Sequence, residues 1–167
     1  MTVFQIEEIG SLLTQMLKGT MFDHFLLQEA SISQAFRTDI DGTLSTHFYS
    51  EEELRERGLS GLRFLPFSHV RPFCLNLLRG NRKPESFRLV FLLSPQNQSG
   101  TIAHTGSSFH TEDVTGMFLN LCYKNDILTC TTGISYRIFS PDKSLEREWD
   151  RLAVLFFRRH GITVKEL

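Results

Sequence analysis

Two histidines and two carboxylates form the densest group of potential metal ligands in the chain: His104, His110, Glu112 and Asp113. Imidazole and carboxylate groups bind zinc and other transition metals, and a bound metal could activate water for hydrolysis. However, the spacing H-x5-H-x-E-D contains no helical i, i+4 ligand pair and matches no metal signature. One hypothesis is therefore a small metal-dependent hydrolase that uses the 104–113 loop, and the other is a solvated polar loop.

A second group of residues is basic and lies next to aromatic residues. Four cations fall within residues 79–88: Arg79, Arg82, Lys83 and Arg88. Because cations neutralise phosphates and aromatic rings stack on bases, this group could bind a single-stranded nucleic acid. In the alternative interpretation, the neighbouring Phe73 and Phe87 belong to the core and the charges are solvated.

The three cysteines, Cys74, Cys122 and Cys130, are an odd number without a C-x-x-C pair, which argues against a disulfide framework and a zinc ribbon. We expect reduced thiols, with Cys122 on the opposite face of its strand from the core. The chain also lacks the sequence motifs of the nucleophile elbow, the phosphate loop, the dinucleotide loop and the zinc-protease helix. These observations favour a non-enzymatic interaction or accessory module, without a cofactor, whose partner is another protein or a second copy of the chain.

The charge of the chain is small overall but segregated. The net charge of −1 over 167 residues is too low for the whole molecule to act as a polycation. Residues 1–53 contain nine acidic residues against Lys18 and Arg37, whereas residues 54–88 contain eight basic residues against Glu56 and Glu85. These two segments could pair within the fold or across a dimer, and the alternative is a local basic patch.

The N-terminus begins MTVFQIEEIGS, with acidic residues where a signal peptide would have basic ones, and no apolar run reaches the length of a membrane span. We therefore expect a cytoplasmic protein that does not enter a membrane.

The first half of the chain predicts a strand at 3–6, an amphipathic helix at 7–18 and a hairpin of residues 25–40 and 43–49 around Asp41-Gly42. A three-residue loop would pair Ile40 with Leu44 and give the hairpin one apolar face, whereas the glycine fits a two-residue loop better. This conflict stays open at the level of sequence. A short helix should follow Ser50 and end by Gly58.

The middle of the chain predicts a helix at 67–79 with Pro72 in its first turn and the following residues inward: Val70, Phe73, Cys74 and Leu77. A central strand at 87–93 should follow, then a short helix opened by Ser94-Pro95 and a partly irregular polar stretch.

The last third predicts a second hairpin of residues 117–123 and 128–139, in which an Asn125-Asp126 loop pairs Tyr123 with Leu128 and Leu121 with Cys130. The final helix, 142–160, should be opened by Ser140-Pro141-Asp142 and have an inward stripe: Leu145, Trp149, Leu152 and Phe156. Together these elements predict one α+β domain, 1–167, built from antiparallel hairpins and amphipathic helices.

Several segments resemble a family of unknown function from anaerobic Gram-positive bacteria. They are the run from Phe25-Leu26-Leu27 to Asp41-Gly42, VRPFCLNLLRG, SFRLVFLLSP, GMFLNLCYKNDILTCTTG and LEREWD. This resemblance covers most of the chain and implies no activity.

A second, fold-level resemblance is to one domain of a DNA sliding clamp, in which a unit of strand, helix and strands occurs twice. The candidate copies are residues 3–49 and 87–139, and the stretch VTGMFLNLCYKNDILTCTTGISYRI resembles the hairpin that ends a clamp unit. Clamps turn basic helices toward DNA, whereas the helix at 7–18 contains only Lys18 and residues 95–104 contain no lysine or arginine. A clamp-like fold would therefore not imply a clamp.

Overall fold

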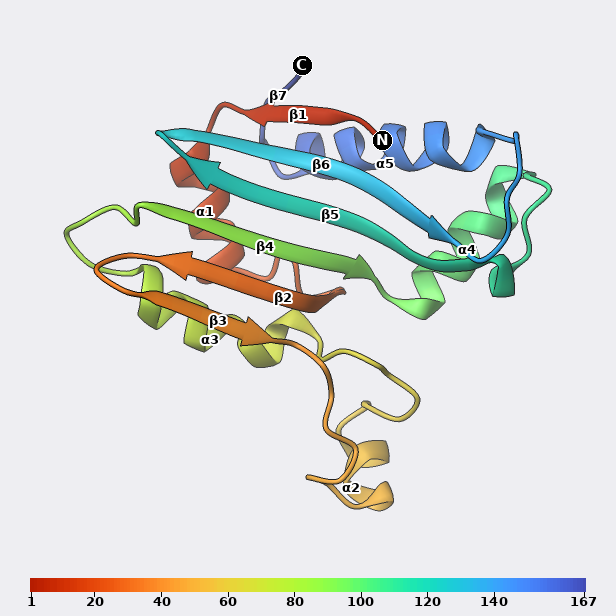
Figure 1. Ribbon diagram of the computed structural model, residues 1–167, viewed down its shortest axis with the longest axis horizontal. Coiled ribbons are helices and arrows are strands. Elements are labelled where there is room, and N and C mark those ends of the chain that lie inside the picture. Colours follow the sequence, from red (N-terminus) through yellow and green to blue (C-terminus); the bar gives the residue numbers. More distant parts are fainter.

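The hairpin with the clearest alternation forms the middle of the sheet. A computed structural model, which describes residues 1–167, places β5 at Val114–Lys124 and β6 at Ile127–Tyr136 (Figure 1). Asn125 and Asp126 form the turn with φ values of 53° and 61°, a left-handed conformation that asparagine and aspartate tolerate. The predicted pairs Tyr123 with Leu128 and Leu121 with Cys130 are confirmed.

Five further strands extend this hairpin into one antiparallel sheet: β1 (Val3–Ile6), β2 (Phe25–Ser33), β3 (Arg37–Asp41), β4 (Ser86–Leu93) and β7 (Val164–Glu166). The strand order is β3-β2-β4-β5-β6-β1-β7. The predicted strands at 3–6 and 87–93 are confirmed, whereas the short β7 was not predicted.

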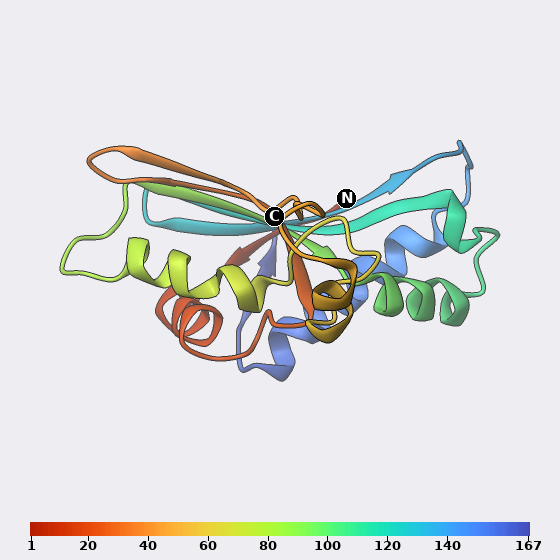
Figure 2. The same cartoon turned by 90° about the horizontal axis from the view of Figure 1, so that it is seen from below.

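The helices are α1 (Ile9–Leu17), α2 (Glu51–Glu56), α3 (Phe67–Leu78), α4 (Pro95–Thr105) and α5 (Ser144–Arg159), with a single 3-10 turn, η1, at Thr111–Asp113. Figure 2 shows α1, α3, α4 and α5 on one side of the sheet, while the other side has no helical layer. The fold is thus α+β, as predicted. None of the helices combines the length and apolarity needed to cross a membrane.

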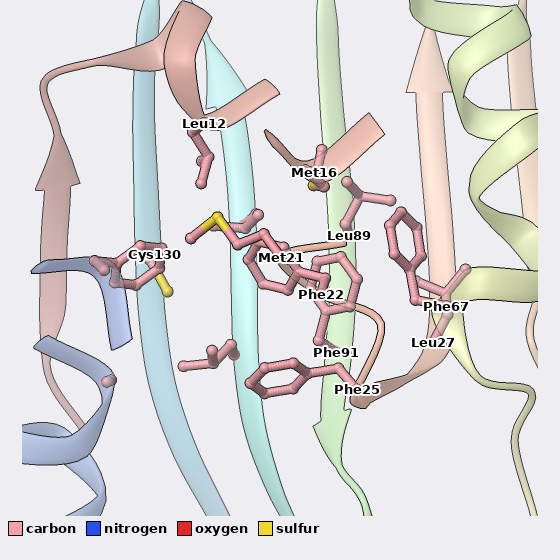
Figure 3. Packing of buried hydrophobic residues seen from close by; sticks show 14 of the residues in the cluster. Leu12, Met16, Met21, Phe22, Phe25, Leu27, Phe67, Leu89, Phe91 and Cys130 are labelled. Carbon is pink, nitrogen blue, oxygen red and sulfur yellow. The ribbon is translucent and has the colours of Figure 1, made fainter. Parts of the chain in front are cut away.

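Aromatic side chains fill the space between the sheet and the helices (Figure 3). Phe22, from the loop after α1, is fully buried, and its ring lies 4.4 Å from that of Phe91 on β4. Phe67 on α3 meets Phe91 edge to face at 5.0 Å. Such aromatic pairs contribute about 0.5–1.5 kcal/mol each beyond the area they bury.

The first hairpin turns at a different place from the predicted one. β2 pairs with β3 from Ser33 and Arg37 to Glu29 and Asp41, so residues 34–36 form the turn and no strand follows Asp41-Gly42. Instead, residues 42–44 run beside residues 63–65, with hydrogen bonds from Leu44 N–H to Arg63 O and from Leu65 N–H to Gly42 O. The Asp-Gly pair therefore marks a close crossing of three backbone segments.

Gly42 is required at this crossing for a steric reason. A Cβ atom at position 42 would lie 1.8 Å from the carbonyl oxygen of Leu27 on β2. Asp41 uses its side chain locally, since its Oδ1 accepts a hydrogen bond from Thr43 N–H at 2.9 Å. Asp41 and Gly42, a pair that is common in hairpin turns, therefore have other roles here: Asp41 forms an Asx turn, and Gly42 allows a close backbone contact.

Two helices also differ in detail from the predictions. Pro72 lies inside α3 and not in its first turn, and Phe73 is 66% exposed, because α3 buries the stripe of Phe67, Val70 and Cys74. The last helix begins at Ser144 and not at residue 142.

The two candidate clamp copies do not form separate halves of the sheet. The strands of the second copy, β4, β5 and β6, lie side by side, and the first copy pairs with both outer strands of this group: β2 with β4 and β1 with β6. The clamp-like repeat is not confirmed by this arrangement.

The crossing at Gly42 gives a test of the fold. We expect Gly42→Ala to destabilise the protein by about 3 kcal/mol, because its methyl group would overlap backbone atoms that cannot move independently. The matched control is Gly10→Ala in α1, where a Cβ meets nothing within 4 Å; it should be neutral or stabilise by up to about 1 kcal/mol. Urea unfolding measures both, and equal stability of the Gly42 variant and the wild type would contradict the crossing.

Candidate functional site

A cleft of about 760 Å³ opens on the helical side of the sheet between α4 and α5. Nine of its nineteen lining residues are hydrophobic, and eight of these come from the sheet and α5: Phe25, Leu93, Leu119, Trp149, Leu152, Ala153, Leu155 and Phe156. Ligand sites in proteins are commonly clefts of about 300–1,000 Å³ with a mostly apolar lining and a few polar groups. The cleft therefore has the size of a small-molecule site, and about half of its lining residues are hydrophobic.

The cleft exists because α4 covers the sheet incompletely. Only Gln98 and Ile102 of α4 are buried, and Gln98 Nε2 donates a hydrogen bond to Val114 O at 3.1 Å. The helix nevertheless forms over all of residues 95–105, because the hydroxyl of Ser94 caps its first turn and Gly106, at φ 66°, ends it. The helix that Ser94-Pro95 is predicted to open thus extends to Thr105, and the polar stretch is irregular only in residues 106–110.

The stripe that α4 turns toward the cleft is small and polar. It consists of residues with helical spacing: Gln96, Asn97, Gly100, Thr101 and His104. At Gly100 a Cβ atom would meet nothing within 4 Å, so the space opposite this residue is empty of protein atoms.

The wall formed by α5 is apolar. The fully inward stripe of this helix is Leu145, Trp149, Ala153 and Phe157. Leu152 and Phe156, which were predicted to complete that stripe, are only half-buried, because they lie at its side and face the cleft. Trp149 is held in place by a hydrogen bond of 3.0 Å from its Nε1 to Phe118 O.

The ionisable side chains around the cleft are three histidines, one arginine and one carboxylate. His24, His104, Arg159 and His160 line it together with a single carboxylate, Glu148. That carboxylate is already engaged by Arg151, at 2.6 and 2.9 Å. Arg159 forms none of the ion pairs of the structure. The cleft thus combines an apolar wall with uncompensated positive charge at its edge.

The structure separates the four candidate metal ligands. His104 lies on α4 at the cleft, whereas His110 and Asp113 bond to each other at η1: Asp113 Oδ2 accepts a hydrogen bond from His110 N–H at 2.8 Å, and the His110 side chain accepts one from the Asp113 backbone. Glu112 is exposed. No three His, Cys, Asp or Glu side chains of the chain come together in a way that could hold a metal ion.

The basic cluster is dispersed as well. Arg79 and Arg82 are exposed in the connection between α3 and β4. Lys83 pairs with Asp126 at 3.2 Å, which raises the pKa of its amine, and Arg88 pairs with Glu29 at 3.1 Å on the open face of the sheet. Nucleic-acid binding through Arg79, Arg82, Lys83 and Arg88 stays a prediction.

The segregated charges pair within the fold in two places, since Arg71 bonds to Asp23 and Arg88 to Glu29. Cys74 and Cys130 are buried, and Cys122 is exposed, as predicted. Burial raises the pKa of the Cys74 thiol to about 11 and also raises the pKa of Cys130, so neither is prepared to act as a thiolate.

One carboxylate, Asp142, joins the 104–113 loop to the start of α5. Asp142 Oδ2 accepts hydrogen bonds of 3.0 Å from the backbone N–H and the hydroxyl of Ser108, and its Oδ1 accepts one of 2.9 Å from Ser144 N–H. It therefore fixes the loop that follows α4 to the first turn of α5. The side-chain cap predicted at Ser140-Pro141-Asp142 is not formed, because the helix begins at Ser144 and its N-cap residue is Lys143.

Sequence reasoning found His104 but not its partners. Met21, His24, Arg159 and His160 come from segments that are distant from α4 in sequence, and nothing in their spacing indicates a shared cleft. The one available signal was the scarcity of large apolar residues in 95–105, which indicates a helix that cannot cover its share of the core.

The link through Asp142 predicts a pH-dependent contribution to stability. The hydrogen bond from Ser108 N–H, with further bonds from Ser144 and the Ser108 hydroxyl, holds the pKa of Asp142 well below its ordinary value. A carboxylate with a depressed folded-state pKa stabilises the fold above its unfolded pKa of about 3.9, and this contribution is lost as the pH falls through the folded-state pKa.

Asp142→Asn should therefore lower the unfolding temperature at pH 7, and its difference from the wild type should shrink as the pH falls below about 4. Glu112→Gln is the control in the same region, because Glu112 is exposed and makes no ion pair. Thermal unfolding followed by circular dichroism measures both variants. A difference for Asp142→Asn that does not depend on pH would contradict the role of the charge.

Comparison with known proteins supplies a family and no activity. No curated protein and no solved structure is significantly similar to the chain. The match to a family model, in contrast, extends over residues 15–165, which is nearly the whole chain. The protein therefore belongs to the family of unknown function DUF5721, as the resemblance of its segments predicts.

Proposed function

We propose that the protein is a non-enzymatic binding module, and that its ligand is a small amphipathic anion held in the cleft between α4 and α5. The observation that carries this proposal is the combination of an apolar cleft of about 760 Å³ with a basic edge that no carboxylate compensates. An apolar chain or ring would lie against Leu152 and Phe156, and a carboxylate or a similar head group would lie near Arg159.

The charge balance is the argument for an anion. Glu148 is neutralised by Arg151, whereas Arg159 is free and exposed at the end of α5. The imidazole of His160 is oriented at the same end of the cleft, because its Nδ1 donates a hydrogen bond of 2.8 Å to Phe156 O. A hydrogen bond to a charged group contributes about 1.5–3 kcal/mol, so a carboxylate gains affinity here and an ammonium group loses it.

The metal-dependent hydrolase that the sequence also suggested has less support, because His104 is the only one of its four candidate ligands that lines the cleft. A binding role requires no ligand cluster, only the shape and charge of the cleft. An accessory role of this kind agrees with the absence of catalytic motifs from the sequence.

The single tryptophan of the chain gives a direct test, because Trp149 lines the cleft. We expect dodecanoate to change the Trp149 fluorescence in a saturable manner. Dodecyltrimethylammonium, which has the same alkyl chain and the opposite charge, should bind with an affinity at least about tenfold lower. No saturable change with either compound, or equal affinity for both, would contradict the proposal.

Two variants locate the binding. Gly100→Leu places a side chain in the empty part of the cleft and should abolish the response, whereas the same change at Gly10, which also faces open space but lies on α1, should not. Arg159→Glu should weaken dodecanoate binding about tenfold, while Arg158→Glu, whose side chain lies outside the cleft, should have little effect. Thermal unfolding of each variant confirms that the fold is retained.

A further inference from the structure

The edge of the sheet formed by β3 has unpaired hydrogen-bonding groups. β3 pairs only with β2 and is the last strand of the sheet on its side (Figure 1). An exposed edge of this kind is a template for pairing with another strand, unless the protein covers or blunts it.

The hydrogen-bond pattern determines which groups are free. Gln34 N–H donates to Phe36 O, and Gly42 N–H donates to Gln28 O, so the even-numbered residues of this hairpin direct their backbone groups toward β2. In an antiparallel ladder the direction alternates along the strand. The backbone N–H and C=O groups of Arg37, Asp39 and Asp41 consequently point outward.

The side chains of these same residues are charged and exposed. Arg37 and Asp39 are 65% and 63% exposed and pair with each other at 2.9 Å on the open face of the sheet. Charges on an edge strand discourage indiscriminate pairing. Here, however, a positive and a negative residue lie two positions apart on the same face of the strand. When an identical strand runs antiparallel beside it, one register places each positive residue opposite the negative residue of the other strand.

We infer that two copies of this chain associate through their β3 strands, with Arg37 of each copy opposite Asp39 of the other. This register places Thr38 opposite its own equivalent on the two-fold axis, which is the isologous arrangement of a symmetric dimer. It also brings outward-directed backbone groups face to face, as hydrogen-bonded pairs require. The two sheets would then form one continuous sheet.

The neighbouring apolar surface fits the same register. Phe36 is 69% exposed, and the position opposite it in the second copy is Ile40. Ile40 lines a groove of about 520 Å³ between β3 and α3, together with Leu65, Val70 and the exposed Phe73. The dimer would thus place Phe36 of one copy beside this groove in the other, where it covers apolar surface that is otherwise in water.

The adjacent register, shifted by two residues, is less favourable. It would still set Arg37 opposite an aspartate, Asp41, but it would place Asp39 opposite Asp39 of the second copy at the centre of the interface, and like charges directly opposite each other are destabilising. The shift in the other direction would set Arg37 opposite Arg37. Charge therefore selects the Arg37 to Asp39 register.

A charge swap tests the interface by sedimentation velocity. The wild type should dimerise as its concentration is raised. Arg37→Asp should weaken the dimer about tenfold or more, since it sets two like-charged pairs opposite each other. The double variant Arg37→Asp, Asp39→Arg should restore it, because the opposite charges are then exchanged. Arg88→Asp, which makes the same change on β4, is the control and should leave the dimer intact.

A cross-link tests the register. In a Cys122→Ser background, which removes the exposed thiol, Thr38→Cys should form a disulfide-linked dimer under mild oxidation, because directly opposite residues bring their Cβ atoms within reach of a disulfide. Asp39→Cys should not. A wild type that stays monomeric into the millimolar range, a dimer indifferent to the charge swap, or cross-linking through position 39 alone would overturn the inference.

Discussion

Phe22 is the residue on which the arrangement of the helical layer depends. It lies in the loop after α1, yet its ring contacts rings from β2, β4, α3 and α5: Phe25 at 5.4 Å, Phe91 at 4.4 Å, Phe67 at 6.5 Å and Phe156 at 5.2 Å. A sheet with one covering layer must bury all of its apolar face under that layer, because the other face meets water. This single ring joins two strands of the sheet to two of the covering helices, α3 and α5, and the 15 phenylalanines of the sequence fit an aromatic core of this kind.

The same constraint explains why the candidate site is where it is. α1, α3 and α5 each contribute buried apolar side chains, whereas α4 contributes only Ile102 and the amide of Gln98. The helical layer consequently leaves part of the sheet uncovered beside α5, and half-buried side chains of α5 such as Phe156 face the resulting cleft. Phe156 therefore belongs to both the core and the cleft, since it packs against Phe22 on one side and lines the cleft on the other. A site built on the core in this way is held rigid by the packing behind it.

The extent to which the sequence predicts the structure differs between the two hairpins for a physical reason. In β5 and β6 the alternation of apolar and polar residues is long enough to define the register, and Asn125-Asp126 tolerates the left-handed turn. In the first hairpin the local signal at Asp41-Gly42 is equally strong, but Gly42 serves a contact with Leu27, 15 positions earlier, that no local pattern contains. Periodicity predicts α1, α3 and α5, and the capping residues Ser50 and Ser94 predict α2 and α4. The cleft, in contrast, arises because α4 has few large apolar residues and because distant segments meet only in the folded chain. His104 could be singled out from sequence, but its relation to Arg159 could not.

If the incompletely covered region beside α5 is a binding site, a titration of the isotopically labelled protein with dodecanoate should show it in the amide and indole N–H chemical shifts. We expect the indole N–H of Trp149 and the amides of α4, the end of α5 and residues 20–24 to shift together with one dissociation constant, while the open face of the sheet is unaffected. Shifts that are largest on the open face or along β3, or the absence of shifts at saturating ligand, would contradict it.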